Sequence, residues 1–171
     1  MKQRDVSVSG ARRPYFISAA LCASMVLTAP ALPAQVGLGW ITAHNGAIPA
    51  DAVSGGNEDG HGLFVCHARH SGGVHPGKVV RNNCNFGYAG AEVAEPDYQV
   101  LVGRGARFVA TSPGVLPPGA FPGGDEDGHL LFICHGPYNG GTHIGKVVGP
   151  NCNIGFGGHE VLLPAYEVLV Q

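Results

Sequence analysis

Two stretches of this chain are near copies of each other, and they decide the fold. Residues 55–93 read GGNEDGHGLFVCHARHSGGVHPGKVVRNNCNFGYAGAEV, and residues 123–161 read GGDEDGHLLFICHGPYNGGTHIGKVVGPNCNIGFGGHEV. Working outward, residues 46–102 and 114–170 align without a gap at an offset of 68, with 32 identities in 57 positions. Such identity indicates duplication, which must be recognised before a fold is named. Two copies are too few for a solenoid and favour a closed arrangement about a pseudo-twofold axis.

Each copy reads as short strands separated by glycine turns. The chain has 28 glycines in 171 residues, and each would cost a helix interior about 1 kcal/mol relative to Ala. Gly72–Gly73 and Gly140–Gly141 have the backbone freedom that hairpin turns need. The strand-like segments are 63–68, 78–80, 84–88 and 100–102, and in the second copy 131–135, 146–148, 152–156 and 168–170. We predict an all-β fold of two tandem repeats of short antiparallel strands, packed with pseudo-twofold symmetry.

The first 34 residues have the composition of an export signal. Four basic residues precede an uncharged, mostly apolar run over 15–29, and the small residues Ala29, Ala31 and Ala34 follow. The run is shorter than the roughly 20 residues that a membrane-spanning helix needs. We predict a signal peptide over 1–34, cleaved after Ala31 or Ala34, and a secreted, periplasmic or extracellular protein. Repeat 1 then covers 38–103 and repeat 2 covers 104–171, both forming one compact domain.

The charge of the chain beyond residue 34 excludes two classes of partner. It keeps six Lys and Arg against eleven Asp and Glu, a formal charge of −5. This net negative charge does not attract nucleic acid or an anionic membrane surface, which are negatively charged themselves. We expect no membrane span after the signal is removed.

Four cysteines remain beyond the signal, in two pairs at matching repeat positions: Cys66, Cys84, Cys134 and Cys152. Four cysteines allow three connectivities. We favour Cys66–Cys84 and Cys134–Cys152, each joining strands on either side of a glycine pair and stabilising the fold by about 3 kcal/mol. The rival interpretation is a zinc or copper site that combines Cys with His67, His70 or His75. Export favours the disulfides.

The repeated motifs together resemble those of the DM-nine repeat family, a domain of unknown function. They are GGNEDG and GGDEDG, LFVCH and LFICH, GKVV in both copies, NCNFGY and NCNIGF, and YQVLV and YEVLV. The resemblance covers essentially the whole chain beyond the signal. It implies a compact all-β protein with its repeats about a pseudo-twofold axis. Some members are mannose-binding lectins, in which an Asp and a Lys at a fixed separation hold the sugar hydroxyls.

That resemblance implies a sugar-binding pair in each repeat. In repeat 2 the matching residues are Asp125 and Lys146, which lie 21 positions apart. In repeat 1 they are Asn57 and Lys78, and Asn lacks the charge that strengthens an acceptor. Repeat 2 is therefore the stronger predicted site. The two lysines are the only ones beyond residue 34, and they share one repeat position.

Other residues complete this interpretation. If the register is shifted by two positions, Asp59 and Asp127 take the acceptor role instead. An aromatic ring such as Tyr88 or Phe156 could cover the apolar C–H face of a sugar. A single exposed site would bind weakly, so two copies or a homodimer would gain affinity through effective concentration.

Several of these residues also have simpler explanations. The segments 55–60 and 123–128 have the composition of acidic turns, and they lack the spaced ligands of a calcium loop. Glu92 and Glu160 fit acceptors of backbone N–H groups near a turn better than contacts to substrate. The repeated histidines fit strand positions with satisfied ring nitrogens better than a metal site: His61, His129, His67, His135, His75 and His143. Tyr98 and Tyr166 read as core residues.

We therefore expect a secreted, lectin-like carbohydrate-binding protein that recognises mannose-type glycans without catalysis, cofactor or metal. One alternative is an extracellular structural or protein-binding β module. The other is a hydrolase that uses Asp and Glu carboxylates. A glycosidase needs two carboxylates at a defined separation in a cleft, whereas the carboxylates here cluster on glycine-rich turns.

Overall fold

A computed structural model describes residues 37–171, so the predicted signal peptide over 1–34 lies outside the described residues. Within 37–171 the secondary structure consists of fourteen strands, and no helix there is long and apolar enough to cross a membrane. The strands are β1 (Leu38–His44), β2 (Ser54–Glu58), β3 (His61–His70), β4 (Gly73–Val80), β5 (Asn83–Tyr88), β6 (Ala91–Glu95), β7 (Asp97–Gly103), β8 (Arg107–Ala110), β9 (Pro122–Glu126), β10 (His129–Tyr138), β11 (Gly141–Val148), β12 (Asn151–Phe156), β13 (His159–Leu163) and β14 (Glu167–Val170).

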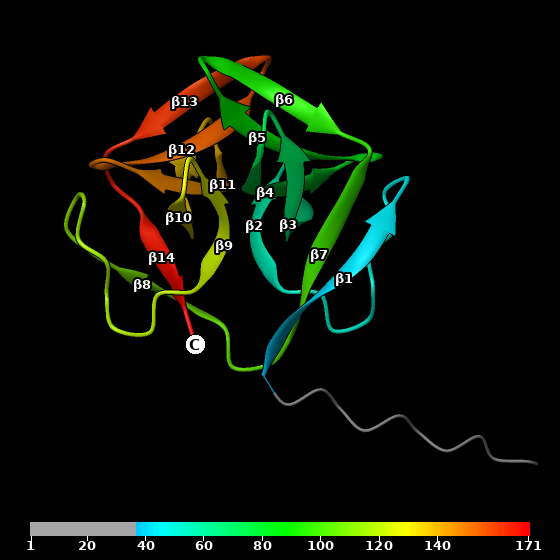
Figure 1. Cartoon of the computed structure of the whole chain (residues 1–171), viewed down its shortest axis with the longest axis horizontal. Helices are drawn as coiled ribbons and strands as arrows, with labels where there is room; N and C mark the ends of the chain where they lie inside the picture. Colours follow the sequence, from blue (N-terminus) through cyan, green and yellow to red (C-terminus); the bar gives the residue numbers. More distant parts are fainter. Residues whose placement is uncertain (1–36) are drawn as a thin grey trace, which may run out of the picture. The chain divides into compact units, whose positions relative to one another are not determined.

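The strands of one repeat correspond one to one with those of the other (Figure 1). Strands β2 to β6 match β9 to β13 in length and in place along the sequence, and β1 and β7 match β8 and β14. All belong to one antiparallel sheet in the order β1-β7-β3-β2-β11-β12-β13-β6-β5-β4-β9-β10-β14-β8. The prediction of an all-β fold of two tandem repeats is confirmed.

Six strands at the centre of the molecule form a closed ring, three from each repeat. The additional pairings β3–β4 and β10–β11 close the order β3-β2-β11-β10-β9-β4. The repeats meet in this ring at two short seams, where Asn57 pairs with Thr142 and Asp125 pairs with Val74. A Cβ atom on Gly56 or Gly124 would collide with the backbone oxygen of Thr142 or Val74. Glycine before each seam residue therefore lets the two repeats approach.

A second junction joins the repeats at the tips of β6 and β13, which meet at the top of Figure 1. Ala91 pairs with His159 there. The Glu92 N–H donates to the Gly158 oxygen and the Glu160 N–H donates to the Gly90 oxygen, both at 3.1 Å. Because the repeats are joined at the ring and again at these tips, the residues between the two junctions are enclosed by both repeats.

Three apolar clusters form the core. One cluster belongs to repeat 1 and surrounds Cys66 and Cys84, and its counterpart in repeat 2 surrounds Cys134 and Cys152. The third lies between the repeats and takes residues from both: Val53, Leu63, Val65, Leu101, Ile133, Ile144 and Leu169. Tyr98 and Tyr166 are buried, as the sequence predicts.

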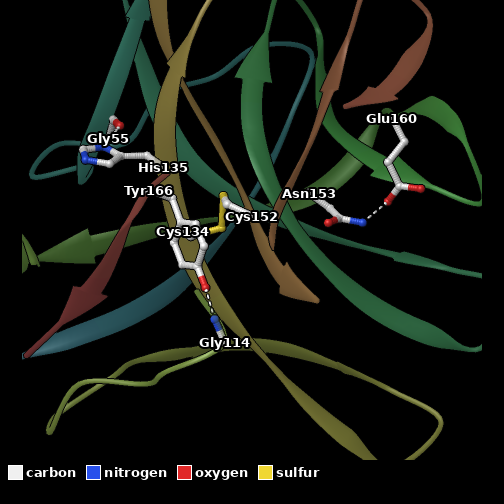
Figure 2. The surroundings of a disulfide bond; sticks show 8 residues. All are labelled: Gly55, Gly114, Cys134, His135, Cys152, Asn153, Glu160 and Tyr166. Atoms are coloured by element: carbon white, nitrogen blue, oxygen red, sulfur yellow. Dashed lines mark hydrogen bonds between the residues drawn. A yellow bond between two sulfur atoms is a disulfide. The ribbon is translucent and has the colours of Figure 1, made fainter. Parts of the chain in front are cut away.

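The two predicted disulfides are present, Cys66–Cys84 and Cys134–Cys152, each with a Cα–Cα distance of 5.9 Å. Figure 2 shows the second one. Each bond joins strands on either side of a glycine pair, as the sequence predicts, but its two cysteines do not pair with each other in the sheet. Cys66 lies opposite Gly77 and Cys84 lies opposite Val79, so the bond links the two strands that flank β4. The sheet coils over β4 and brings these two strands together.

The hairpin turns also lie one residue earlier than predicted. Ser71 and Gly72 have φ values of 47° and 86°, and Asn139 and Gly140 have 46° and 80°. Two central residues with positive φ make a type I′ turn, which matches the twist of the flanking strands. Gly73 instead begins β4, where a Cβ would approach the Asp125 oxygen to 2.7 Å. It therefore serves the contact between the repeats rather than the turn.

Candidate functional site

The two lysines beyond residue 34 are buried, and each is partnered by the opposite repeat. Lys78, on β4, is 1% exposed, and its Nζ lies 2.7 Å from Nδ1 of His143 on β11. The same nitrogen lies 3.9 Å from Oε2 of Glu58 and 5.4 Å from the centre of the Phe156 ring. Asn85 stands directly opposite Lys78 in the β4–β5 register. These five residues are called cluster A.

Cluster B repeats this arrangement with the repeats exchanged. Lys146, on β11, is 2% exposed, and its Nζ lies 2.9 Å from Nδ1 of His75 on β4. The same nitrogen lies 3.8 Å from Oε2 of Glu126 and 5.3 Å from the centre of the Tyr88 ring. Asn153 stands opposite Lys146 in the β11–β12 register. Neither repeat holds a complete cluster by itself.

Backbone contacts decide which histidine nitrogen faces the lysine. Nε2 of His143 lies 3.1 Å from the Tyr138 oxygen, and Nε2 of His75 lies 3.2 Å from the His70 oxygen. A carbonyl oxygen only accepts, so Nε2 carries the hydrogen and Nδ1 presents its lone pair. Each ammonium therefore donates to a neutral imidazole. The expectation that these histidines have satisfied ring nitrogens is confirmed.

Burial shifts the pKa of all four central groups in one direction. It lowers the pKa of Lys78 and of Lys146, and nearby glutamates oppose this shift in part. The pKa values of His75 and His143 are lowered first by burial and then by the adjacent ammonium. Both effects disfavour the charged histidine. The clusters are thus arranged to hold one positive charge each, on the lysine.

The clusters retain unused hydrogen-bonding capacity. An ammonium has three N–H donors, and in the described part of the chain only the histidine lies within hydrogen-bond distance of each one. The glutamate oxygens at 3.9 and 3.8 Å are too distant for a direct hydrogen bond. Oδ1 of Asn85 and of Asn153 is buried without a partner within residues 37–171. Buried polar atoms of this kind are uncommon in native proteins.

Two further glutamates hold the asparagines and tie the repeats together. Nδ2 of Asn153 donates to Oε1 of Glu160 at 2.9 Å, as Figure 2 shows. Nδ2 of Asn85 donates to Glu92 in the same way, also at 2.9 Å. The second oxygens of Glu160 and Glu92 accept from the backbone N–H groups of Gly90 and Gly158 in the opposite repeat. The prediction that these glutamates bind backbone N–H groups near a turn is confirmed.

Solvent reaches each cluster at its glutamate. Glu58 is 30% exposed and lines an open pocket of about 680 Å³ together with Asp59, Arg81 and Asn85. Glu126 is 33% exposed and lines a pocket of about 320 Å³. The glutamate therefore connects the buried ammonium with a surface pocket in both repeats.

The predicted acceptors Asp125 and Asn57 do not face the lysines. Both are exposed and each precedes the cluster glutamate by one residue in a strand, so it points to the other face of that strand. Asp59 and Asp127 lie at the following turns with φ values of 48° and 49°, and both are exposed. The structure brings Lys146 together with Glu126.

The sequence does not single out Glu58 and Glu126, although both glutamates occupy the same repeat position. The rings of Tyr88 and Phe156, offered by the sequence as possible covers for a sugar face, lie against the buried lysines of the opposite repeat. Within residues 37–171, no three His, Cys, Asp or Glu side chains are grouped so that they could hold a metal ion.

Comparison with known proteins gives a family and a fold. The family model of the DM9 repeat matches the chain over residues 26–83 and 57–161. No curated protein sequence matches it. The fold is similar to that in the crystal structure of the nematode sperm cell motility protein MFP2B, with a TM-score of 0.56 and 16% identity. That match covers 87% of this chain and 51% of the other, so this chain spans about half the length of that protein.

Proposed function

This chain belongs to the DM9 repeat family, and from that premise we propose that it is an exported carbohydrate-binding protein that recognises mannose-type glycans without catalysis. The observation that carries the proposal is the gap of 3.9 or 3.8 Å between a buried ammonium and a solvent-reached carboxylate, present in both repeats. Such a pair offers a donor and an acceptor to one hydroxyl-bearing molecule. The two disulfides support export, because such bonds persist in oxidising compartments.

The chemistry of a sugar hydroxyl matches this pair. A hydroxyl donates one hydrogen bond and accepts others, so it can donate to Glu126 and accept from Lys146 at the same time. Hydrogen bonds to charged groups are roughly twice as strong as neutral ones. The amide oxygen of Asn153 adds a neutral acceptor on the opposing strand. Glu58, Lys78 and Asn85 offer the same three groups in repeat 1.

The family resemblance implies Asp125 and Asn57 as the acceptors, and we keep them in the proposal beside the two glutamates. Asp125 and Asn57 precede the glutamates that lie nearest the lysines, and they are exposed on the other face of the same strands. In this proposal Lys146 and Lys78 supply the charged donors, and the glutamates supply the acceptors nearest to them. Variants at Asp125 and at Glu126 separate the contributions of the two adjacent carboxylates.

The test is a glycan array probed with the full, oxidised chain and with Lys146→Met and Lys78→Met. Met has nearly the length of Lys and removes the charge, so the fold is expected to survive; circular dichroism and intact disulfides check this. We expect mannose-type signals from the parent chain, weaker signals from each variant and none from the double variant. Asp127→Asn, an exposed turn position, is the matched control and should bind as the parent does.

Two results would overturn this function. A blank array from well-folded protein would leave an extracellular structural or protein-binding module as the better explanation. Turnover of a glycan by the parent chain would indicate a hydrolase.

A third result would change the site but not the function. Loss of binding in Asp127→Asn but not in Lys146→Met would reject the lysine clusters and favour the shifted register.

A further inference from the structure

A pocket that belongs to neither lysine cluster lies at each end of the sheet. Strands β1, β7 and β3 carry it in repeat 1, and strands β8, β14 and β10 carry it in repeat 2. Its volume is about 540 Å³ in repeat 1 and about 470 Å³ in repeat 2. Every residue that lines the second pocket has a counterpart, 68 positions earlier, among those that line the first. The duplication has therefore kept this pocket in both repeats.

A row of hydrogen-bonded side chains crosses the pocket of repeat 1. Thr42, Gln99 and His67 stand opposite one another on β1, β7 and β3. Nε2 of Gln99 donates to Oγ1 of Thr42 at 3.4 Å, and its Oε1 lies 2.8 Å from Nε2 of His67. Nδ1 of His67 donates to the Gly123 oxygen of repeat 2 at 2.6 Å. The row is thus held in place by contacts within and between the repeats.

Two opposite charges line the same pocket without pairing with each other. Arg69 lies two positions beyond the row on β3, and Asp97 lies two positions before it on β7, so both share the face of the row. Both are exposed, and within residues 37–171 neither takes part in a salt bridge. The third charged residue on the wall, Glu95, already lies 2.8 Å from Nδ1 of His70. A guanidinium and a carboxylate therefore remain for a ligand.

The pocket of repeat 2 lacks this pair of charges. The replacements are Pro137 for Arg69, Ala165 for Asp97 and Ala110 for Thr42. Its one carboxylate, that of Glu167, already lies 3.1 Å from Nε2 of His135. Because the pocket persists in repeat 2 without the two charges, the fold does not require them. Their presence in repeat 1 points to a ligand that only this repeat binds.

We propose that the pocket of repeat 1, named here the Arg69 pocket, binds free α-amino acids. The guanidinium of Arg69 can donate two parallel hydrogen bonds to the α-carboxylate of the ligand. The Asp97 carboxylate can accept from its α-ammonium group. One positive and one negative charge match a zwitterion, whereas a ligand with a single charge would leave one of the two unmatched. A volume of about 540 Å³ is in the usual range for a small-molecule site and leaves room for the ligand's side chain.

The experiment is a screen of the common L-α-amino acids by saturation-transfer NMR on the full, oxidised chain, followed by calorimetric titration of those that bind. We expect saturable binding with a dissociation constant of about 1 mM or lower for at least one of them. Asp97→Ala copies the residue of repeat 2, and Arg69→Gln removes the guanidinium. Each should weaken the affinity by about tenfold, since each removes a hydrogen bond to a charged group. Circular dichroism checks that these surface variants fold.

Controls on the ligand and on the chain test the role of each charge. Arg107→Gln removes an exposed charge from β8 and should bind as the parent does. The N-acetyl and methyl-ester forms of the best ligand each lack one charge and should bind the parent more weakly. The N-acetyl form should lose no further affinity in Asp97→Ala, because the two changes remove the same contact.

Three results would overturn the Arg69 pocket as an amino-acid site. They are the absence of binding by any amino acid to folded protein, equal affinity for the N-acetyl form, and full affinity in both Asp97→Ala and Arg69→Gln. The site does not rest on the proposed glycan binding, because its residues are distinct from both lysine clusters. A blank glycan array would therefore leave it standing, and its own failure would leave the glycan proposal untouched.

Discussion

Clusters A and B share four residue types, which we call their centres. They differ in the residues around these four, which we call their edges. Lysine, histidine, glutamate and asparagine occupy identical repeat positions in both. The ring over the lysine is Phe156 in cluster A and Tyr88 in cluster B. The residue whose backbone oxygen holds the histidine is Tyr138 in one and His70 in the other. His70 also pairs with Glu95 at 2.8 Å, and Leu163 takes the position of Glu95 in repeat 2.

This comparison shows which contacts are the same in both clusters. Each cluster takes its lysine from one repeat and its histidine from the other. A change to a lysine in one repeat therefore leaves a histidine of the other repeat without its partner. The edge residues make contacts mostly within their own repeat, so they can change singly. The two halves could diverge at Tyr88 and His70 while the buried centres stayed the same.

The pockets at the two glutamates have diverged further. The pocket at Glu58 measures about 680 Å³ and has Arg81 on its wall, whereas the pocket at Glu126 measures about 320 Å³. Leu130 narrows the second pocket at the position where repeat 1 has Gly62. The pocket in repeat 1 therefore has more room than its counterpart, although the family resemblance points to repeat 2 as the stronger site.

The largest expected effect is the loss of a cluster histidine. Within residues 37–171, His143→Ala removes the single close acceptor of the buried Lys78 ammonium, so it should lower the free energy of unfolding by about 3 kcal/mol. His75→Ala should cost a similar amount, because the lysine contacts of the two clusters match. Urea denaturation measures both values. A difference of more than about 1.5 kcal/mol between the two variants would show that the edges, and not the centres, control stability.

A double-mutant cycle provides the control for that prediction. Removal of both partners of a buried polar pair costs less than leaving one unpaired. The chain with both His143→Ala and Lys78→Met should therefore be less destabilised than the sum of the single variants. Additive effects would contradict a direct interaction between the two side chains.

The pH dependence of stability should come from the same histidines. Burial and the adjacent ammonium lower the pKa of His75 and His143 below the ordinary value of 6.5. Below about pH 6.5 the unfolded chain binds protons at these rings that the folded chain does not. The free energy of unfolding therefore falls with decreasing pH, by at most about 1.4 kcal/mol per pH unit for each ring.

The measurement is urea denaturation from pH 7.5 to 5 for the parent chain and for His143→Gln and His75→Gln. Each variant should flatten the pH profile, since Gln does not titrate. His129→Gln, at an exposed repeat position, should leave the slope unchanged. An unaltered slope in both cluster variants would place the titrating groups elsewhere.

The sequence predicts what lies within one repeat and fails at what the two repeats build together. Cys66 and Cys84 are 18 positions apart, and local strand geometry brings them into one bond. Lys78 and His143 are 65 positions apart, and their contact depends on how the repeats dock. No periodicity in a single repeat contains that information. The identity of the histidine and the glutamate in both copies was a usable signal, because a docked pair imposes the same requirement twice.

The choice between Asp125 and Glu126 shows a second limit. Both are acidic and adjacent, so only the strand's orientation decides which one faces the lysine. Composition indicated turns over 55–60 and 123–128, yet residues 54–58 and 122–126 are strands that carry the seams between the repeats. Glycine-rich segments lack the apolar alternation that identifies a strand. Their pairing is fixed instead by close backbone approach, which glycine permits.

The smallest expected effect is the loss of the edge pair that distinguishes cluster B. His70 and Glu95 are each 29% exposed, so their interaction is weakened by solvent and should contribute less than about 1 kcal/mol. His70→Tyr combined with Glu95→Leu converts this edge to the sequence of repeat 2. Urea denaturation at pH 7.5 should then show a free energy of unfolding within that limit of the parent value. A loss several times larger would mean that His70 orients His75 through more than its backbone oxygen, and that the two clusters differ at their centres as well as at their edges.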